Sequence, residues 1–424
     1  MSTLPRPIED KATETRVYQC GFAIEKPGGE FHLGELAYRG DRLDFETNYD
    51  GAIAEYIKGG GEFISPATNL RTFVDIGCLK LPSFQIDPGT DPIAPKVAAF
   101  IRKYADVPPD WPDIDAHYIL MTWVFDRFSA VPYLRFLGES GTGKTRLLEI
   151  HAALCYRPLF LVGNVTGAAL FRSINLVQGT LVIDESDLKS SEAWSDVVKV
   201  LNNGYSRGGS VIRCNKDNGY ATEAFAVYGP KVIATRGRFS DDALENRCLT
   251  RETIRKTPHK DIPLQLPPEF YREAQKLRNQ LLGWRFRKYS QIRPDDSGLR
   301  HLPPRLAQIG ASLIAVGETP EAKAGLIEFL NRYNAEAQES SETGLVEQIA
   351  KELITKEPIK VSKIADEANL RLGFELDYTG EWFLEDGESK PLTPKRVGGI
   401  LRSLGYKTTR KRLGYLAHPL GELG

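Results

Sequence analysis

The sequence predicts a mixed α/β fold, in which a parallel sheet forms the central domain, with a β-rich module before it and a small helical domain after it. A short apolar strand, a glycine-rich loop and a helical pattern follow one another between residues 133 and 155. Two further apolar segments, at 180–185 and 231–236, end in polar residues. Strands that alternate with helical segments are typical of a parallel sheet covered by helices.

The composition is that of a globular protein with several domains. The 424 residues are 41% hydrophobic and 26% charged, which are ordinary values for such proteins. The absence of a long apolar run and of an N-terminal apolar signal core favours a protein with no membrane segment. The cysteines form no C-x-x-C pair and the histidines are scattered, so we expect neither a disulfide framework nor a metal cluster, and a cytoplasmic location. The cysteines are Cys20, Cys78, Cys155, Cys214 and Cys248.

Residues 1–92 form the expected β-rich N-terminal module. Its segments 17–24 and 30–38 are short and bounded by glycine and proline, as strands joined by turns are. The module could bind DNA or a partner, but it carries no motif, and we expect it to brace the next domain.

The most specific motif is the stretch from Gly138 to Thr145, which fits the phosphate-loop pattern G-x-x-x-x-G-K-[ST] at every position. Its glycines let backbone N–H groups turn toward a polyphosphate, and the following helix adds partial positive charge. Lys144 can reach the β- and γ-phosphates, and the Thr145 hydroxyl can hold Mg²⁺. The residues expected to bind a nucleotide here are Gly138, Glu139, Ser140, Gly141, Thr142, Gly143, Lys144 and Thr145.

Asp184 and Glu185 follow the apolar residues 180–183 and are expected at the carboxyl edge of the same sheet. Asp184 would hold Mg²⁺, directly or through water, and Glu185 would polarise the attacking water as a general base.

Residues 210–225 are predicted to form a β-hairpin, because two β-prone arms flank the turn-forming residues 215–219. A lysine at a hairpin tip is usually a surface residue. In a ring-shaped assembly, however, Lys216 at the tip, with Arg213 in the first arm, would contact a phosphate backbone.

Thr235 ends the predicted strand 231–236 and could contact a γ-phosphate or orient the attacking water. Arg247 follows about a dozen residues later, where an arginine could stabilise the charge of the transition state on a neighbouring subunit. Arg236 and Arg238 are competing candidates for that role.

Arg305 lies in the first turn of a helix predicted after two prolines. A cation at a helix N-terminus is unfavourable to the helix dipole, which indicates an anionic contact.

The segment 339–424 is predicted to be a winged helix. Three helical segments, at 344–356, 361–371 and 393–405, precede two β-like pieces. The third helix could enter a DNA groove and the wing contact phosphates, although a winged helix that contacts only protein fits the same pattern. The candidate DNA-binding residues here are Lys395, Arg396, Arg402, Arg410, Lys411 and Arg412.

Taken together, these residues resemble the AAA+ ATPases, and more narrowly the compact replicative helicases of phages, plasmids and mobile elements, which are relatives of the superfamily 3 and minichromosome maintenance helicases. The loop 138–145 resembles their Walker A motif, and 182–185 their Walker B motif. The segment 211–225 resembles their pre-sensor-1 hairpin, with Lys216 as the pore lysine. Thr235 stands at the sensor 1 position, where many members carry Asn.

The resemblance also implies roles for two arginines and a set of partners. Arg247, within Glu-Asn-Arg-Cys, resembles the arginine finger, and Arg305 a sensor 2 arginine. The family implies a P-loop AAA+ ATPase core over 93–265, a helical lid over 266–338 and a winged-helix domain over 339–424. It further implies ATP and Mg²⁺ between the subunits of a homo-hexameric ring, single-stranded or forked DNA in its pore, and primase or other replication proteins as partners.

Two other functions are compatible with the sequence. A non-translocating AAA+ DNA-binding protein, such as a helicase loader, an origin initiator or a transposition regulator, would bind DNA through the winged helix and use ATP to control assembly. A phosphotransferase kinase is disfavoured, because the chain devotes its length to a basic hairpin and a winged helix rather than to an acceptor pocket.

Overall fold

In the computed structural model the chain divides into two compact units, residues 1–329 and 330–424. The described residues are 8–9, 16–17, 21–25, 31–35, 37–39, 42–44, 73–74, 76–82, 92–161, 165–184, 193–215, 221–239, 241–289, 291–339, 342–354, 357–377, 379–383, 391–411 and 414–418.

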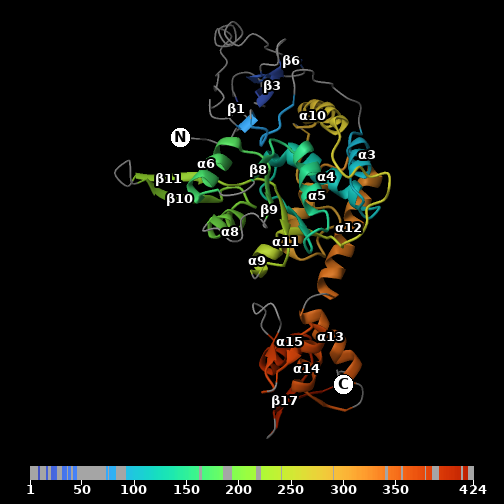
Figure 1. Ribbon diagram of the computed structural model, residues 1–424. Helices are drawn as coiled ribbons and strands as arrows, with labels where there is room; N and C mark the ends of the chain where they lie inside the picture. Colours follow the sequence, from blue (N-terminus) through green and yellow to red (C-terminus); the bar gives the residue numbers. More distant parts are fainter. Residues whose placement is uncertain are drawn as a thin grey trace. The chain divides into compact units, whose positions relative to one another are not determined.

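The first unit begins with short antiparallel strand pairs (Figure 1). The pairs are β1 (Ile8–Glu9) with β2 (Arg16–Val17), β3 (Gly21–Glu25) with β4 (Phe31–Glu35), and β5 (Ala37–Arg39) with β6 (Arg42–Asp44).

A five-stranded sheet with the order β13-β7-β12-β9-β8 forms the centre of the first unit. All of its strand pairs are parallel, which confirms the predicted mixed α/β fold with a parallel sheet. Its strands are β7 (Tyr133–Leu137), β8 (Leu159–Leu161), β9 (Leu181–Asp184), β12 (Lys231–Thr235) and β13 (Cys248–Glu252). Because parallel strands end at one edge, Leu137, Asp184 and Thr235 lie at the same edge of the sheet.

Helices cover this sheet. Helix α10 packs against α3, α4 and α5, α3 packs against α4, and α5 also contacts β7, β9 and β12. The helices of the first unit are α3 (Ala94–Tyr104), α4 (Trp111–Trp123), the 3-10 turn η1 (Phe125–Arg127), α5 (Lys144–Leu154), α6 (Gly167–Val177), α8 (Ala193–Asn203), α9 (Asp242–Glu245), α10 (Pro268–Lys288) and α11 (Pro304–Ile314), with α12 (Pro320–Glu339) crossing into the second unit.

The predicted hairpin is formed by β10 (Ser210–Asn215) and β11 (Ala221–Ala226), which pair antiparallel. Buried apolar residues of α6, α8 and the sheet pack together with Val211 and Val227 at its base. Figure 1 shows the two strands extending away from the sheet beside α6. The hairpin is therefore attached firmly at its base while its strands leave the body of the unit.

Lys231 anchors the two chain segments that enter and leave the hairpin. Its side chain is buried, with a relative exposure of 1%. The ammonium nitrogen donates to the carbonyl oxygens of Gly204 and Val227, both at 3.0 Å, and of Gly229 at 2.7 Å. Burial lowers the pKa of Lys231 to about 7, and the three carbonyl oxygens oppose that shift because they accept from the ammonium form.

The second unit contains three helices around its own apolar core, which includes Val346, Ile364 and Leu401. The helices are α13 (Glu342–Leu353), α14 (Val361–Arg371) and α15 (Pro394–Ser403). The strands β14 (Ile359–Lys360), β18 (Gly414–Ala417) and β17 (Thr408–Lys411) form a sheet in that order, and β15 (Glu375–Leu376) pairs with β16 (Trp382–Phe383).

Helix α15 begins as its sequence predicts. Pro394 occupies the first turn, and the Thr393 hydroxyl accepts a hydrogen bond from the Arg396 amide at 3.3 Å.

The described residues contain neither a membrane-spanning helix nor a metal-binding cluster. None of their helices is both long and apolar enough to cross a bilayer. No group of three or more His, Cys, Asp or Glu side chains among them is arranged to hold a metal ion.

We predict that Lys231→Met destabilises the first unit by about 2–4 kcal/mol, because three buried carbonyl oxygens lose their donor. Thermal unfolding followed by circular dichroism measures the change. The control is Lys96→Met on α3, where the lysine is exposed and the free energy of unfolding should change by less than about 0.5 kcal/mol. Equal midpoints for the two variants would contradict the anchoring role.

Candidate active site

The glycine-rich loop connects β7 to α5, and its backbone needs glycine at defined positions. Gly141 and Gly143 have φ angles of 80° and 87°, a region that disfavours other residues. Gly143 is the N-cap residue of α5, which begins at Lys144. At Gly138 a Cβ atom would lie 2.4 Å from both the backbone oxygen and the hydroxyl oxygen of Thr253. The loop thus follows a path that only this glycine pattern permits.

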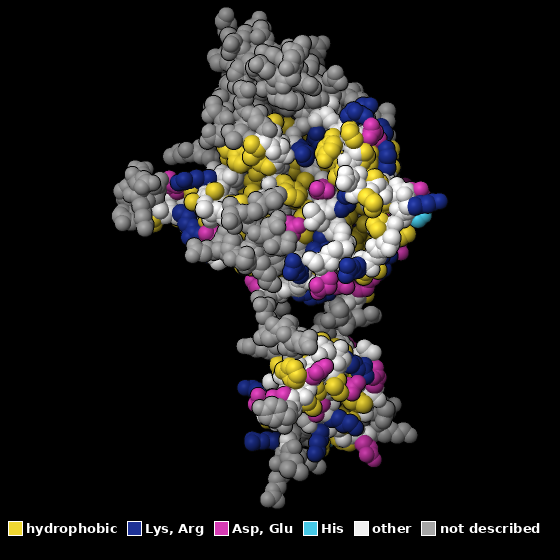
Figure 2. All heavy atoms as spheres, viewed as in Figure 1, with side chains coloured by type: hydrophobic (Ala, Val, Ile, Leu, Met, Phe, Trp, Pro, Cys, Tyr) yellow, Lys and Arg dark blue, Asp and Glu magenta, His cyan; other side chains and the backbone are white. Residues whose placement is uncertain are grey.

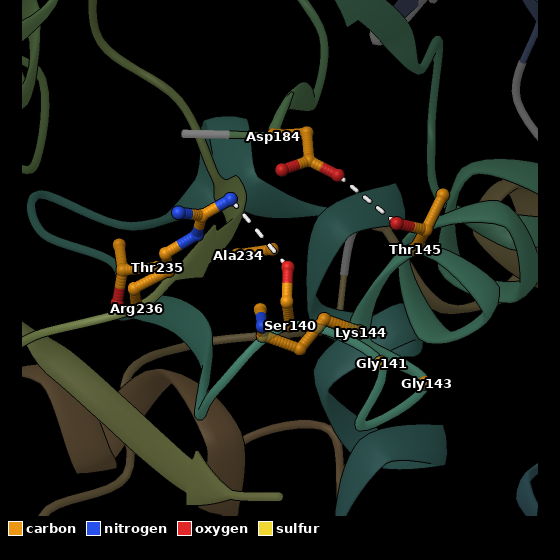
Figure 3. A pocket seen from close by; sticks show the side chains of 9 residues that line it. All are labelled: Ser140, Gly141, Gly143, Lys144, Thr145, Asp184, Ala234, Thr235 and Arg236. Atoms are coloured by element: carbon orange, nitrogen blue, oxygen red, sulfur yellow. Dashed lines mark hydrogen bonds between the residues drawn. The ribbon is translucent and has the colours of Figure 1, made fainter. Parts of the chain in front are cut away.

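Thr145 and Asp184 meet although they belong to different elements. The Thr145 hydroxyl, in the first turn of α5, donates to Asp184 Oδ2 at the end of β9, at 3.1 Å (Figure 3). Lys144 Nζ donates to the carbonyl oxygens of Gly138 and, at 2.7 Å, Glu139. These contacts place one ammonium, one hydroxyl and one carboxylate around the mouth of the loop.

A cavity of about 370 Å³ lies at this edge of the sheet. Arg236 also reaches it, and its Nη2 atom lies 3.5 Å from Ser140 Oγ. Figure 3 shows how the lining side chains are arranged. The lining residues are Ser140, Gly141, Gly143, Lys144, Thr145, Asp184, Ala234, Thr235 and Arg236.

Thr235 is one of the residues that line this cavity, and its hydroxyl is a buried polar group. Thr235 is only 1% exposed, and its Oγ1 atom has no hydrogen-bond partner among the described residues. A buried hydroxyl without a partner costs free energy, and a ligand or water that reached it would recover part of that cost.

The side chains fit a divalent cation of the magnesium type. A hydroxyl and a carboxylate are hard oxygen donors, and Mg²⁺ takes few protein ligands and completes its shell with water and phosphate oxygens. Thr145 and Asp184 supply such a pair, 3.1 Å apart. Lys144 and Arg236 add positive charge for the phosphates themselves.

Thr253 braces the loop, and no local pattern in the sequence singles it out. Its amide and its hydroxyl donate to the Leu137 carbonyl, at 2.7 and 3.0 Å. Its hydroxyl also lies 2.8 Å from that of Thr142. The loop position therefore depends on the residue that follows β13.

Arg247 lies at the opposite edge of the sheet from the loop. Its carbonyl oxygen accepts from the Tyr133 amide at 2.9 Å, at the start of β7, whereas Gly138 follows the end of that strand. Five residues of strand separate the two by roughly 16 Å. Its Nη1 atom donates to Asn202 Oδ1 at 2.6 Å. Arg247 is thus remote from the cavity of its own chain.

The other candidate arginines have different surroundings. Arg236 lines the cavity of its own chain, and Arg238 pairs with Glu252 at 2.8 Å, where both side chains are exposed. Arg305 lies with Arg247 instead of with the loop, because both guanidinium groups contact the ring of Tyr205.

The residues expected to contact DNA are spread over the two units. Arg213 in the hairpin pairs with Asp196 at 2.5 Å. In the second unit Arg396 pairs with Glu342 at 2.7 Å, and Arg402 donates to the Thr408 hydroxyl at 3.2 Å. Figure 2 shows Lys and Arg side chains on the surface of the second unit.

The remaining DNA-binding candidates lie on α15, on β17 or outside the described residues. Lys395 and Arg410 are exposed on α15 and β17, and Lys411 ends β17. Glu185, Lys216 and Arg412 lie outside the described residues.

Comparisons with known proteins give structural matches alone. No protein-family model matches the chain, and no curated protein matches it. A JCV helicase structure with a bound acetamide compound is 16% identical, with a TM-score of 0.26, and covers 62% of this chain. This chain spans only 65% of the JCV helicase chain.

Two further solved structures match this chain with similarly low sequence identities and TM-scores. The NrS-1 C-terminal region is 12% identical with a TM-score of 0.34, and 90% of this chain and 92% of that chain are covered. The Thermotoga maritima RuvB Holliday junction branch migration motor is 12% identical with a TM-score of 0.23. The match covers 76% of this chain and 96% of the RuvB chain. At these values the likeness assigns no activity to this chain.

We predict that Thr235→Val leaves the free energy of unfolding unchanged or slightly higher, because a methyl group replaces a hydroxyl that has no partner among the described residues. ATP hydrolysis should fall at least about tenfold if that hydroxyl contacts the nucleotide or the water. A coupled ATPase assay and thermal unfolding on the same preparation measure both. The matched control is Thr180→Val, also buried but outside the cavity lining. Full activity in Thr235→Val would refute the assignment.

Proposed function

We propose that this chain is an AAA+ ATP hydrolase acting as a DNA helicase of a mobile genetic element or phage. The observation that carries the proposal is the contact between Thr145 and Asp184 beside the glycine-rich loop. It places the oxygen ligands of a magnesium ion next to a loop suited to a triphosphate.

Each residue around the cavity has a proposed role in hydrolysis. The backbone of the loop and Lys144 bind the phosphates, and Thr145 and Asp184 hold the metal ion. That ion, when bound, neutralises charge on the phosphate oxygens. Glu185, next along the chain from Asp184, accepts a proton from the attacking water, and Thr235 orients that water.

The position of Arg247 supports a shared site. An arginine roughly 16 Å from its own loop cannot stabilise the transition state there. A second copy of the chain, placed head to tail, would receive it, and head-to-tail contacts that close produce a ring. We infer a homo-hexameric ring with Arg247 as the arginine finger, in preference to Arg236 and Arg238.

The hairpin is the proposed contact to single-stranded DNA. Lys216 at its tip would bind backbone phosphates in the pore, and Arg213, held by Asp196, would lie beside it. Forked DNA is then the substrate, and primase or other replication proteins are the expected partners.

A second function has one observation in its favour. The second unit has three helices and a three-stranded sheet, with exposed Lys395, Arg402 and Arg410. If this winged helix binds duplex DNA by sequence, the chain would be a non-translocating initiator, helicase loader or transposition regulator. The helicase is preferred because Lys216, near the tip of the predicted hairpin, offers a contact to a translocating single strand, which such a switch does not require.

The first test is the ATPase rate with and without single-stranded DNA, on protein sized by light scattering in the presence of ATP. We expect severalfold stimulation and a particle the size of a hexamer. Lys144→Ala should abolish nucleotide binding, whereas Glu185→Gln should retain binding and stop hydrolysis. A monomer or dimer whose ATPase rate does not change with single-stranded DNA would reject the helicase and favour the non-translocating DNA-binding protein.

The two DNA contacts can be separated by two further variants. Lys216→Ala should abolish unwinding of a forked duplex but leave DNA-independent hydrolysis intact. Arg402→Ala should weaken duplex binding. The slope of log K against log salt concentration should fall by about one, the contribution of one phosphate contact. Arg300→Ala, whose side chain is 90% exposed, is the control for both. Unwinding at the wild-type rate by Lys216→Ala would exclude the hairpin as the DNA contact.

A further inference from the structure

Tyr205 lies between two arginines that come from distant parts of the chain. Its ring centroid is 4.5 Å from the guanidinium carbon of Arg247 and 4.4 Å from that of Arg305. Both distances are within the range of a cation–π contact. Tyr205 follows α8 and precedes β10, so one aromatic ring joins the end of α9, the start of α11 and the segment that enters the hairpin.

The two arginines carry positive charge that no described carboxylate balances. Arg247 donates to the amide oxygen of Asn202 at 2.6 Å, and Arg305 to that of Gln308 at 2.9 Å. Both acceptors are neutral. Arg305 also lies in the first turn of α11, where the helix end adds further positive charge. Two like charges held together beside a helix N-terminus repel one another, and an anion would relieve that repulsion.

The ionisation of Tyr205 is consistent with this excess of positive charge. Burial alone would raise the pKa of Tyr205. The hydrogen bond to Ser206, the charge of Arg305 and a hydrogen bond to Arg305 outweigh burial, with a smaller contribution from Arg247, so its pKa is lowered. The phenol oxygen therefore lies in a positive field.

The arginine pair cannot bind the phosphates held by the loop of its own chain. The Tyr205 carbonyl accepts from the Val131 amide at 2.9 Å, and the Arg247 carbonyl from the Tyr133 amide at the same distance. Both contacts lie at the start of β7, roughly 16 Å from the loop that follows its end. Any phosphate bound by the pair must come from another molecule.

We propose that Tyr205 is a positioning residue that holds Arg247 and Arg305 as one two-arginine site for the terminal phosphate of ATP bound by a second copy of the chain. The proposal rests on the proposed function and deepens it. It moves Arg305 from the nucleotide of its own chain to that of a neighbour, and it assigns a role to Tyr205. Two guanidinium groups give more donors to one phosphate than a single arginine.

The test mixes two variants of the full-length protein, each inactive for a different reason. Lys144→Ala protein supplies the arginine pair but binds no nucleotide, and Arg247→Ala protein supplies the nucleotide site without a complete pair. Their mixture should hydrolyse ATP although neither does so alone. Tyr205→Ala is then introduced into one protein or the other, and the ATPase rates of the two mixtures are compared.

We expect at least a tenfold lower rate when Tyr205→Ala is in the Lys144→Ala protein than when it is in the Arg247→Ala protein. Arg305→Ala should show the same asymmetry. Tyr205→Phe in the Lys144→Ala protein should lose less activity than Tyr205→Ala, because it keeps the ring and loses only the hydroxyl that bonds to Arg305. Tyr271→Ala, an exposed tyrosine on α10, is the matched control and should behave alike in both placements.

The possible failures are distinguishable. Wild-type protein that hydrolyses no ATP would reject the proposed function itself. If the wild type is active, a mixture that recovers no activity would reject Arg247 as the arginine finger of a shared site, and the two-arginine site with it. Equal losses from both placements of Tyr205→Ala in an active mixture would overturn the two-arginine site alone. Should Tyr205→Ala fail to fold, the two placements of Arg305→Ala decide the question, and equal losses there would overturn the proposal.

Discussion

The common direction of the sheet strands is the constraint on which the remaining structure depends. Tyr133 is in register with Lys231 on one side and Cys248 on the other, and every pairing is parallel. The loop and the last residues of β9 and β12 therefore share one edge, while Arg247 and Tyr205 lie at the other. The two edges differ chemically, because Lys144 and Asp184 lie beside the glycine-rich loop at one and two arginines contact a tyrosine ring at the other.

A buried ion pair connects these two edges. Arg135, in the middle of β7, is fully buried and donates to both carboxylate oxygens of Glu245, at 2.7 and 2.5 Å. Glu245 also accepts from the Phe239 amide at 2.6 Å. The pair fixes the segment before Arg247 to the strand that ends in the glycine-rich loop, and removal of either partner would leave an uncompensated buried charge.

Local patterns allow the sheet and the cavity to be predicted from the sequence. The strand 133–137 and the helix 361–371 match β7 and α14, and the phosphate-loop motif anticipates the approach of Asp184 to Thr145. The brace from Thr253 and the contacts of Tyr205 could not be predicted, since they join residues more than forty positions apart in sequence and leave no local periodicity. The position of Arg305 could not be predicted either, because the start of a helix in the sequence does not indicate which edge of the sheet that helix end lies at.

The crowding at Gly138 bears on how such a chain can evolve. A Cβ atom there would meet the backbone oxygen of Thr253 as well as its side chain, so no exchange at position 253 would make room for one. The first glycine of the motif is thus imposed by the neighbouring strand, independently of any phosphate. A descendant that lost nucleotide binding but kept this sheet would still retain that glycine, and glycine at this position alone is no sign of an active ATPase.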